Sequence, residues 1–340
     1  MRFAYVKAIL AAGALSLALT ALLYSPSQHV VFDATLDELT SIELESPSLK
    51  VTLVPGKSFW SARTSQIKDA SQPPVVQEFR VSDKALATLN QTLAPLTAYR
   101  AWPLTQIDEL AEYGLSREDG KKSILSLKTN AHTTTLELGV DGYGHRDTYA
   151  ITHTPQPSMV LINGELTRLF TYAPASLMDK DLLTATSQEI KSISITYTHI
   201  KNQNLALTHH INTDAMMSYW SYTSRSPGRS LLASRFVSQL MNLKVKEAPA
   251  EAATWWEELP TTRELIIHSK GTSDEVVTLR QIPKAPSTYL ARSSRTHHVV
   301  TLYEPLARQL FLTAQETLSG ESSETPLAPP RHEFGDGHHH

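Results

Sequence analysis

The sequence predicts an α+β fold made of two tandem repeats of an antiparallel meander sheet, preceded by one N-terminal transmembrane helix. Three observations predict it: an uncharged apolar run at the N-terminus, alternating apolar and polar segments in the same order in both halves, and a helical apolar pattern within each half. Each module is expected to follow the order β-β-α-β-β-β-β-α, with its helices on one face of the sheet. The expected domains are a membrane anchor or signal at residues 1–24, a first module at 25–183, a second module at 184–318 and a disordered tail at 319–340.

The N-terminal segment has the composition of a membrane-crossing helix. Arg2 and Lys7 precede an apolar run without charge at residues 8–24. Such a run is about long enough to cross a bilayer, and the preceding positive charge predicts that the rest of the chain lies outside the cytoplasm. A cleavable signal peptide is the competing interpretation. Both interpretations export residues 25–340 from the cytoplasm.

Each module is expected to open with two strands and an amphipathic helix. Residues 39–45 and 190–196 alternate apolar and polar side chains, and each segment is followed by a second strand with a tryptophan, Trp60 or Trp220. The helix of the first module carries Leu86, Leu89, Leu93 and Leu96, and that of the second carries Leu231, Phe236, Leu240 and Leu243. Spacings of three and four residues place such side chains on one helix face.

The remainder of each module is expected to form four strands and a closing helix. In the first module the strands are residues 123–127, 134–138, 148–151 and 158–162, and the helix is 165–172. In the second module they are residues 264–268, 276–280, 287–292 and 298–302, with a helix at 305–317. Strands joined by short turns in this way favour an antiparallel meander.

The composition is that of a globular protein without unusual charge. The chain has 340 residues, of which 41% are apolar and 19% are charged, and this length suggests about two domains. The net charge of −3 gives no basic excess to neutralise phosphates, so nucleic acid is not an expected partner. The absence of cysteine excludes disulfides, thiolate metal sites and a cysteine nucleophile.

One segment carries a family resemblance. A helix ends at Tyr113-Gly114-Leu115, and it is followed by paired strands that end at Leu138-Gly139 and by a strand that contains Tyr149. This pattern resembles the family catalogued as domain of unknown function 4340 (DUF4340), best over residues 36–183. The second module has only the strand order and lacks the Tyr-Gly-Leu turn. The resemblance implies a membrane-anchored bacterial protein that accompanies ABC-type export or gliding-motility machinery, and it supplies no catalytic residues.

Histidine pairs are the first candidates for metal binding. His209-His210 and His297-His298 lie in predicted strands or at strand edges, where neighbouring side chains point to opposite faces. One such pair therefore does not readily chelate a single ion. Three histidines at residues 338–340 could bind a transition metal loosely, in a tail that is predicted to be disordered. No metal site is expected.

No catalytic or cofactor motif is present in the sequence. Neither a Gly-x-Ser-x-Gly nor a His-Glu-x-x-His pattern occurs, and the glycine-rich residues 139–145 are interpreted as a loop between strands. Asp179 and Asp181 are interpreted as linker charges between the modules. The sequence therefore predicts no catalytic residues, no cofactor and no enzyme activity.

Tryptophan residues provide the remaining candidate site. Trp60 and Trp220 are expected to pack in the core of each module. Trp255 and Trp256 are placed in a loop, and two adjacent rings are not readily buried together from one strand. One interpretation is that one of them faces a protein partner, because tryptophan is enriched at binding hot spots. The alternative is a local cap over the second module.

These observations favour a non-catalytic periplasmic accessory or scaffolding subunit of a membrane-bound complex. The expected partners are the membrane, through the N-terminal helix, and proteins of an ABC-type export or motility apparatus. The alternative is a periplasmic solute- or metal-binding protein with its ligand between the two modules. A hydrolase of the envelope would need a nucleophile–base pair that the sequence does not display.

Overall fold

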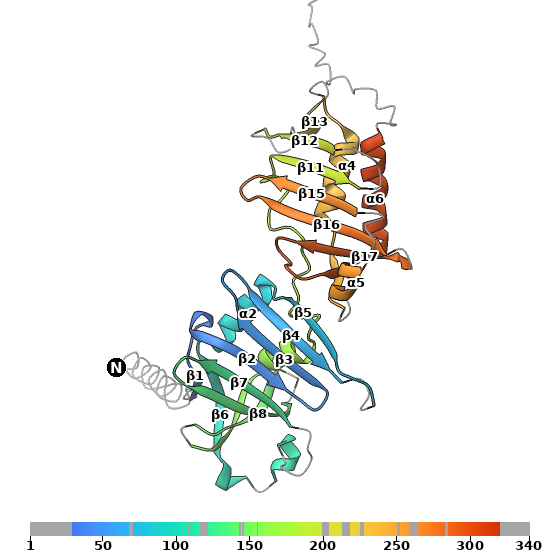
Figure 1. Cartoon of the computed structure of the whole chain (residues 1–340). Helices are drawn as coiled ribbons and strands as arrows, with labels where there is room; N and C mark the ends of the chain where they lie inside the picture. The colour runs from blue at the N-terminus through green and yellow to red at the C-terminus, as the bar shows by residue number, and fades with distance from the viewer. Residues whose placement is uncertain are drawn as a thin grey trace, which may run out of the picture. The chain divides into compact units, whose positions relative to one another are not determined.

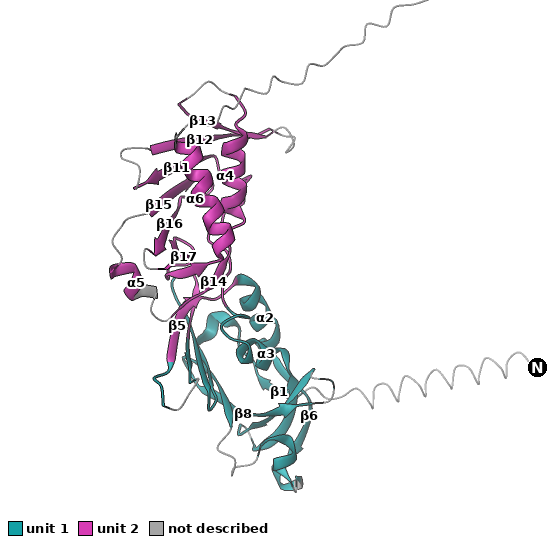
Figure 2. Cartoon of the chain, turned by 90° about the vertical axis from the view of Figure 1, so that its right-hand side faces the viewer, with its two compact units in different colours: residues 1–58, 64–74, 83–177 teal, residues 59–63, 75–82, 178–340 magenta. Residues whose placement is uncertain are grey.

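The computed structural model of the chain describes residues 29–319, apart from short segments at 68–70, 108, 116–121, 143, 145, 155, 199–203, 213–217, 225–227, 250–251, 259–263 and 283–284. The chain divides into two compact units (Figure 2). Unit 1 takes its described residues from 1–58, 64–74 and 83–177, and unit 2 takes them from 59–63, 75–82 and 178–340. Unit 2 therefore includes two short segments that precede most of unit 1 along the chain.

The first half of the chain forms a ten-stranded sheet in the order β1-β6-β10-β9-β8-β7-β2-β3-β4-β5 (Figure 1). The strands are β1 (His29–Phe32), β2 (Leu39–Glu45), β3 (Leu49–Pro55), β4 (Trp60–Gln66), β5 (Val75–Arg80), β6 (Leu96–Pro103), β7 (Ser123–Thr129), β8 (Thr133–Asp141), β9 (Asp147–Thr152) and β10 (Ser158–Asn163). The helices are η1 (Leu36–Glu38), α2 (Asp83–Leu93), η2 (Leu104–Gln106), η3 (Leu110–Tyr113) and α3 (Glu165–Thr171).

The second half forms an eight-stranded sheet in the order β13-β12-β11-β15-β16-β17-β18-β14 (Figure 1). The strands are β11 (Ser192–Tyr197), β12 (Asn204–His210), β13 (Tyr219–Tyr222), β14 (Val245–Glu247), β15 (Glu264–Lys270), β16 (Glu275–Ile282), β17 (Ala285–Ser293) and β18 (Val300–Leu302). The helices are α4 (Leu231–Met241), α5 (Ala252–Glu258) and α6 (Glu304–Ser319), of which α4 and α6 lie side by side along the sheet (Figures 1 and 2).

The local sequence explains why strand β11 and helix α4 form. In β11 the buried residues Ile193, Ile195 and Tyr197 alternate with more exposed ones, as a strand with one buried face requires. Helix α4 begins where the Ser230 hydroxyl accepts a hydrogen bond from the Ala233 backbone N–H at 3.1 Å, because a serine N-cap satisfies one of the free donors of the first turn.

The predicted α+β fold, with two tandem repeats of the order β-β-α-β-β-β-β-α, is wrong. The described chain is mostly antiparallel β-structure in two large sheets, with few helices. Strands β1 to β5 precede α2, β11 to β13 precede α4, and α5 lies between β14 and β15. Strands as short as β13 and β14 carry too few residues for alternation to be read, so only their partners define them as strands.

Two residues of the predicted helix faces also differ from expectation. Leu96 begins β6 rather than ending α2, and it follows Pro95, which cannot donate a helical hydrogen bond. Leu231 opens α4 with 46% of its surface exposed, whereas Phe236 and Leu240 are buried. The helical spacing was therefore correct for the middle of each helix and wrong at its ends.

The two ends of the chain lie outside the described residues. They include the predicted membrane helix at residues 1–24 and residues 320–340 of the predicted tail. Among the residues that are described, no helix has both the length and the apolar character needed to cross a membrane.

Unit 2 contains a buried ion cluster around Asp179, which is only 4% exposed. Arg295 Nε donates a hydrogen bond to Asp179 Oδ2 at 2.7 Å, and Arg80 Nε lies 3.4 Å from the same oxygen. The backbone N–H of Asp181 donates to the other carboxylate oxygen at 3.1 Å. The sequence interpreted Asp179 as a linker charge, and the structure shows it as a buried anion that holds two arginines.

Replacement of this anion is expected to be costly. Asp179→Asn should lower the free energy of unfolding by about 3–5 kcal/mol, because it leaves two guanidinium groups buried without their shared carboxylate. Asp181→Asn is the matched control, since Asp181 is half-exposed and pairs with half-exposed Lys244, and it should cost less than about 1 kcal/mol. Urea unfolding of both variants measures the difference, and equal costs would contradict this account.

Candidate functional site

The most distinctive recess of unit 1 lies at the ends of β6, β9 and β10, beside the segment that contains η2 and η3. Its volume is about 620 Å³, within the range of small-molecule sites. Its described lining residues are Trp102, Ile107, Glu109, Glu112, Tyr113, Tyr149 and Met159. We call this cavity the aromatic recess.

The floor of the aromatic recess is set by strand register. Met159 in β10 lies opposite Trp102 in β6 and opposite Ile151 in β9, so the three side chains share one face of the sheet. Met159, Ile151 and Leu115 are at most 4% exposed and form an apolar cluster. Trp102, Tyr113 and Tyr149 pack against that cluster and are only partly buried, which leaves part of each ring at the recess.

One wall of the aromatic recess is the Tyr113-Gly114-Leu115 turn, which lies very close to Gly139 in β8. A Cβ atom on Gly139 in β8 would lie 2.1 Å from the Tyr113 carbonyl oxygen, so only glycine allows the Tyr113-Gly114-Leu115 turn to approach this strand. Gly114 adopts a φ of +66°, which other residues rarely do. The turn places the Tyr113 ring edge-on to Tyr149, with 4.8 Å between ring centroids.

Among the described lining residues of the aromatic recess, the charged side chains are both carboxylates. Glu109 and Glu112 are exposed at its rim, and neither forms an ion pair with any described residue. None of the lining residues named above is a serine, threonine, histidine or lysine, so they include no nucleophile–base pair. The described lining therefore presents aromatic rings and carboxylates to the cavity.

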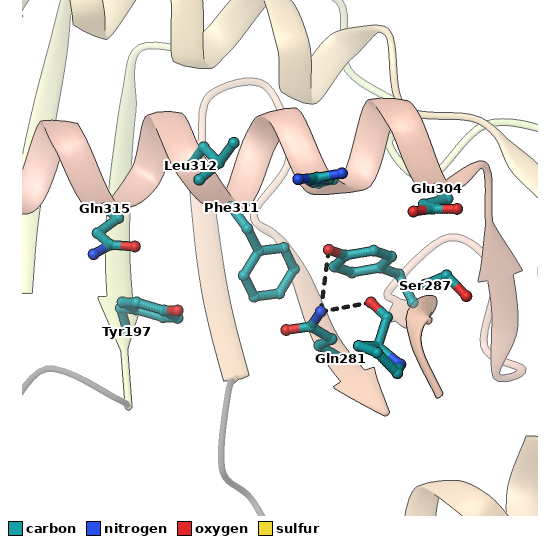
Figure 3. Close-up of a pocket in the computed structure, with 10 residues that line it drawn as sticks. Tyr197, Gln281, Ser287, Glu304, Phe311, Leu312 and Gln315 are labelled. Atoms are coloured by element: carbon teal, nitrogen blue, oxygen red, sulfur yellow. Dashed lines mark hydrogen bonds between the residues drawn. The ribbon is translucent and has the colours of Figure 1, made fainter. Parts of the chain in front are cut away.

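A second cavity, of about 460 Å³, lies in unit 2 against α6 (Figure 3). Tyr197, Tyr289 and Phe311 are at most 7% exposed, and Phe311 contacts both tyrosines, with centroid distances of 6.1 Å to Tyr197 and 5.4 Å to Tyr289. Gln281 Nε2 donates to the Pro286 carbonyl oxygen at 2.6 Å and lies 3.3 Å from the Tyr289 hydroxyl. In this second cavity, Phe311 therefore already contacts both tyrosine rings, and the Gln281 amide already has hydrogen-bond partners.

The predicted partner residues Trp255 and Trp256 lie in helix α5 rather than in a loop, and both are half-buried. Trp255 lines a cavity of about 450 Å³ together with Tyr303, which is 47% exposed. Trp256 lies under the Arg280 guanidinium, whose Cζ is 4.2 Å from a Trp256 ring centroid. Arg280 also donates to the Trp256 carbonyl oxygen and to Glu264. Trp256 is thus fixed by a local contact, and Trp255 is the one that borders a cavity.

The other predicted tryptophans are confirmed as core residues, with Trp60 9% and Trp220 6% exposed. His209 stacks on Trp220 with centroids 4.5 Å apart, and its Nδ1–H donates to the Ile190 carbonyl oxygen at 2.9 Å. His210 stacks on Tyr219, its own cross-strand neighbour. The two histidines therefore make separate contacts, as the strand geometry predicted.

His297, in the second histidine pair, also packs against an aromatic ring. His297 stacks on Phe59 with a centroid distance of 4.3 Å and adopts a φ of 57°. Across the described part of the chain, no three histidine, aspartate or glutamate side chains are grouped to hold a metal ion. The histidines at residues 338–340 lie outside the described residues.

The fold and the cavities define a class: an antiparallel β-protein of two units that carries ligand-sized, aromatic-lined cavities. The sequence profile of the family described as "Domain of unknown function (DUF4340)" matches residues 74–255, more than half of the chain. The chain belongs to the DUF4340 family. The match contains every described lining residue of the aromatic recess. It begins at residue 74 rather than 36, and it extends beyond residue 183 into unit 2 as far as Trp255. No curated protein and no solved structure matches the chain.

Sequence reasoning identified only part of the aromatic recess. Tyr113 and Tyr149 were noted as motif residues, but Trp102 was not considered. The available signal was a Trp-Pro pair shortly before a segment with several carboxylates. That signal does not show that Trp102 and Tyr149, 47 positions apart, approach the same cavity through strands β6, β10 and β9.

Stability is expected to fall as the pH drops below about 6.5. Burial, Arg80 and Arg292 lower the pKa of His297 below its ordinary value, and burial lowers the pKa of His298 against the opposing charge of Glu78. The unfolded chain then binds more protons than the folded chain, so the free energy of unfolding decreases as the histidines become protonated. Carboxylates with lowered pKa values lose their contribution only in a more acidic range.

Urea unfolding at about pH 7.5 and about pH 5.5 tests this sign. The double variant His297→Asn/His298→Gln should show a smaller difference between the two pH values than the unmodified chain. Asparagine is chosen because it tolerates the positive φ at position 297. The variant of exposed His132→Gln is the control, and an unchanged pH difference in the double variant would contradict the assignment.

The glycine at the wall of the aromatic recess should be intolerant of a methyl group. Gly139→Ala should lower the free energy of unfolding by about 1–3 kcal/mol or more, because the added Cβ overlaps the Tyr113 carbonyl oxygen. Gly142→Ala is the matched control, since its Cβ would meet no atom closer than 3.4 Å. Chemical unfolding of the two variants measures the difference, and similar values for both would show that the turn does not depend on this contact.

Proposed function

We propose that this chain is a non-catalytic accessory subunit of a membrane-bound complex, with its bulk in the periplasm of a bacterium. The apolar residues 8–24 after Arg2 and Lys7 support export or anchoring at the inner membrane. The resemblance described above associates the DUF4340 family with ABC-type export and gliding-motility machinery, which favours a complex of that kind. An accessory role requires a surface that binds protein, not an active site.

The observation that carries this proposal is the pair of aromatic side chains Trp255 and Tyr303 beside one cavity of unit 2. Tyr303 is 47% exposed, and Trp255 is held at the cavity by α5. Large aromatic side chains contribute strongly to protein interfaces when a partner covers them. Lys246 and Glu247 line the same cavity and give it a polar border, as is common at the rim of an interface.

Addition of a strand to the edge of the second sheet is a less favourable mode of binding. The N–H of Val245 in the outermost strand β14 already donates to the Lys180 carbonyl oxygen at 2.9 Å. Asp181 forms an isolated bridge with Lys244 next to it. Because these backbone groups are engaged, the aromatic surface is the better candidate for partner contact at this end of the sheet.

Replacement of Trp255 should weaken the complex without unfolding the chain. Trp255→Ala should reduce recovery of membrane-embedded partner subunits by roughly 30-fold, which corresponds to a hot-spot contribution of about 2 kcal/mol. Affinity purification from gently solubilised membranes, followed by mass spectrometry, measures the recovery. Tyr172→Ala is the matched control, because Tyr172 is 66% exposed in unit 1 and lies far along the chain from α5.

A photo-crosslinking amino acid in place of Tyr303 provides a second measurement that does not depend on complex stability. It should attach to a permease or ATPase-associated subunit, and the same group at position 172 should not. Equal recovery with Trp255→Ala and the control, together with no position-specific crosslink, would contradict the proposed surface. A chain that purifies without any membrane subunit would contradict the accessory role itself.

A further inference from the structure

We propose that the aromatic recess of unit 1 binds a small organic ammonium ion, with the cation against the rings of Trp102, Tyr113 and Tyr149 and opposite the carboxylates of Glu109 and Glu112. The inference concerns a different unit from the proposed partner surface and does not rest on the proposed function. It names a ligand class, a positively charged nitrogen with alkyl substituents, of which quaternary ammonium groups are the simplest members.

The ring arrangement is the first argument. Trp102 and Tyr149 project from the sheet face that also carries buried Met159, and Tyr113 meets Tyr149 edge-on from the opposite wall. Aromatic faces attract cations through the ring quadrupole, and tryptophan does so most strongly. Alkylated ammonium ions suit such a site because their alkyl groups also gain from contact with the apolar floor.

The sign of the charge is the second argument. Glu109 and Glu112 both line the recess, and no described cation is paired with either of them. Glu109 and Glu112 are three positions apart and lie on one turn, in which the Glu112 N–H donates to the Glu109 carbonyl oxygen at 3.3 Å. Two carboxylates at the mouth of an aromatic cavity favour a cationic ligand over an anionic or neutral one of the same size.

The cavity against α6 is an internal comparison that sharpens the assignment. It also has three aromatic rings, but Tyr197 and Tyr289 both pack against Phe311, and all three are almost fully buried. Its rim includes both Glu304 and Arg308, so it offers no single sign of charge. Of these two cavities, the aromatic recess is the one that combines partly buried rings with carboxylates alone among its charged described lining residues.

Calorimetric titration of the full chain, in a non-ionic maltoside detergent, tests the assignment with defined probes. Choline and tetramethylammonium chloride should bind. The alcohol 3,3-dimethylbutan-1-ol should bind at least tenfold more weakly than choline, because it has the same shape with carbon in place of the charged nitrogen. Raising the salt concentration should weaken choline binding, since the carboxylates are exposed.

Variants measure separately how much the carboxylates and the aromatic rings contribute to choline affinity. Glu109→Gln/Glu112→Gln should weaken choline binding at least tenfold, and Trp102→Leu should weaken it similarly. Glu165→Gln, at an exposed carboxylate of the same unit outside the recess, is the matched control and should leave affinity unchanged. Tyr149→Phe should retain most of the affinity, because it keeps the ring. If Trp102→Leu does not fold, the double glutamine variant still tests the inference.

Three results would overturn the inference: no heat of binding with either ammonium probe, equal affinity for choline and its neutral analogue, or unchanged affinity in the double glutamine variant. These measurements use the isolated chain without a partner. Failure of the accessory role would leave them unaffected, and their failure would leave the Trp255 surface untouched.

Discussion

The pairing of antiparallel strands into two broad sheets is the constraint on which the rest of this protein depends. In an antiparallel sheet, side chains alternate between faces, and each apolar face must be covered. Strand β10 shows the consequence in unit 1, because it buries Val160 and Ile162 on one face and Met159 on the other. A sheet with two buried faces at this end needs a second cover, and the chain between β6 and β7 supplies it.

That second cover is what creates the aromatic recess. The segment with η2 and η3 is too short and irregular to bury the whole face, so Trp102 and Tyr149 stay partly accessible beside the buried Met159. The close contact of Gly139 with the Tyr113 turn fixes how near this cover lies to the sheet. A cavity with half-exposed rings is therefore a direct result of how the sheet edge is closed.

The buried and the exposed carboxylates of this protein have different surroundings. Asp179 is kept inside unit 2 only because Arg295 and Arg80 approach the same oxygen, whereas Glu109 and Glu112 stay at the surface of unit 1 with no described ion-pair partner. A buried carboxylate with two arginines contributes to structure, and exposed carboxylates beside aromatic rings are suited to recognition.

Neighbouring residues were enough to predict most long strands, the middle of the main helices, the opposite faces of His209 and His210, and the Tyr113-Gly114-Leu115 turn. Only the tertiary structure decided the identity of β14 as a strand, the burial of Asp179, and the meeting of Trp102 with Tyr149. It also separated Trp256, held by Arg280, from Trp255 at a cavity. Periodicity and turn chemistry are local properties that a sequence displays, whereas burial and cavities depend on which distant strands pair, and that pairing is not written in any single segment.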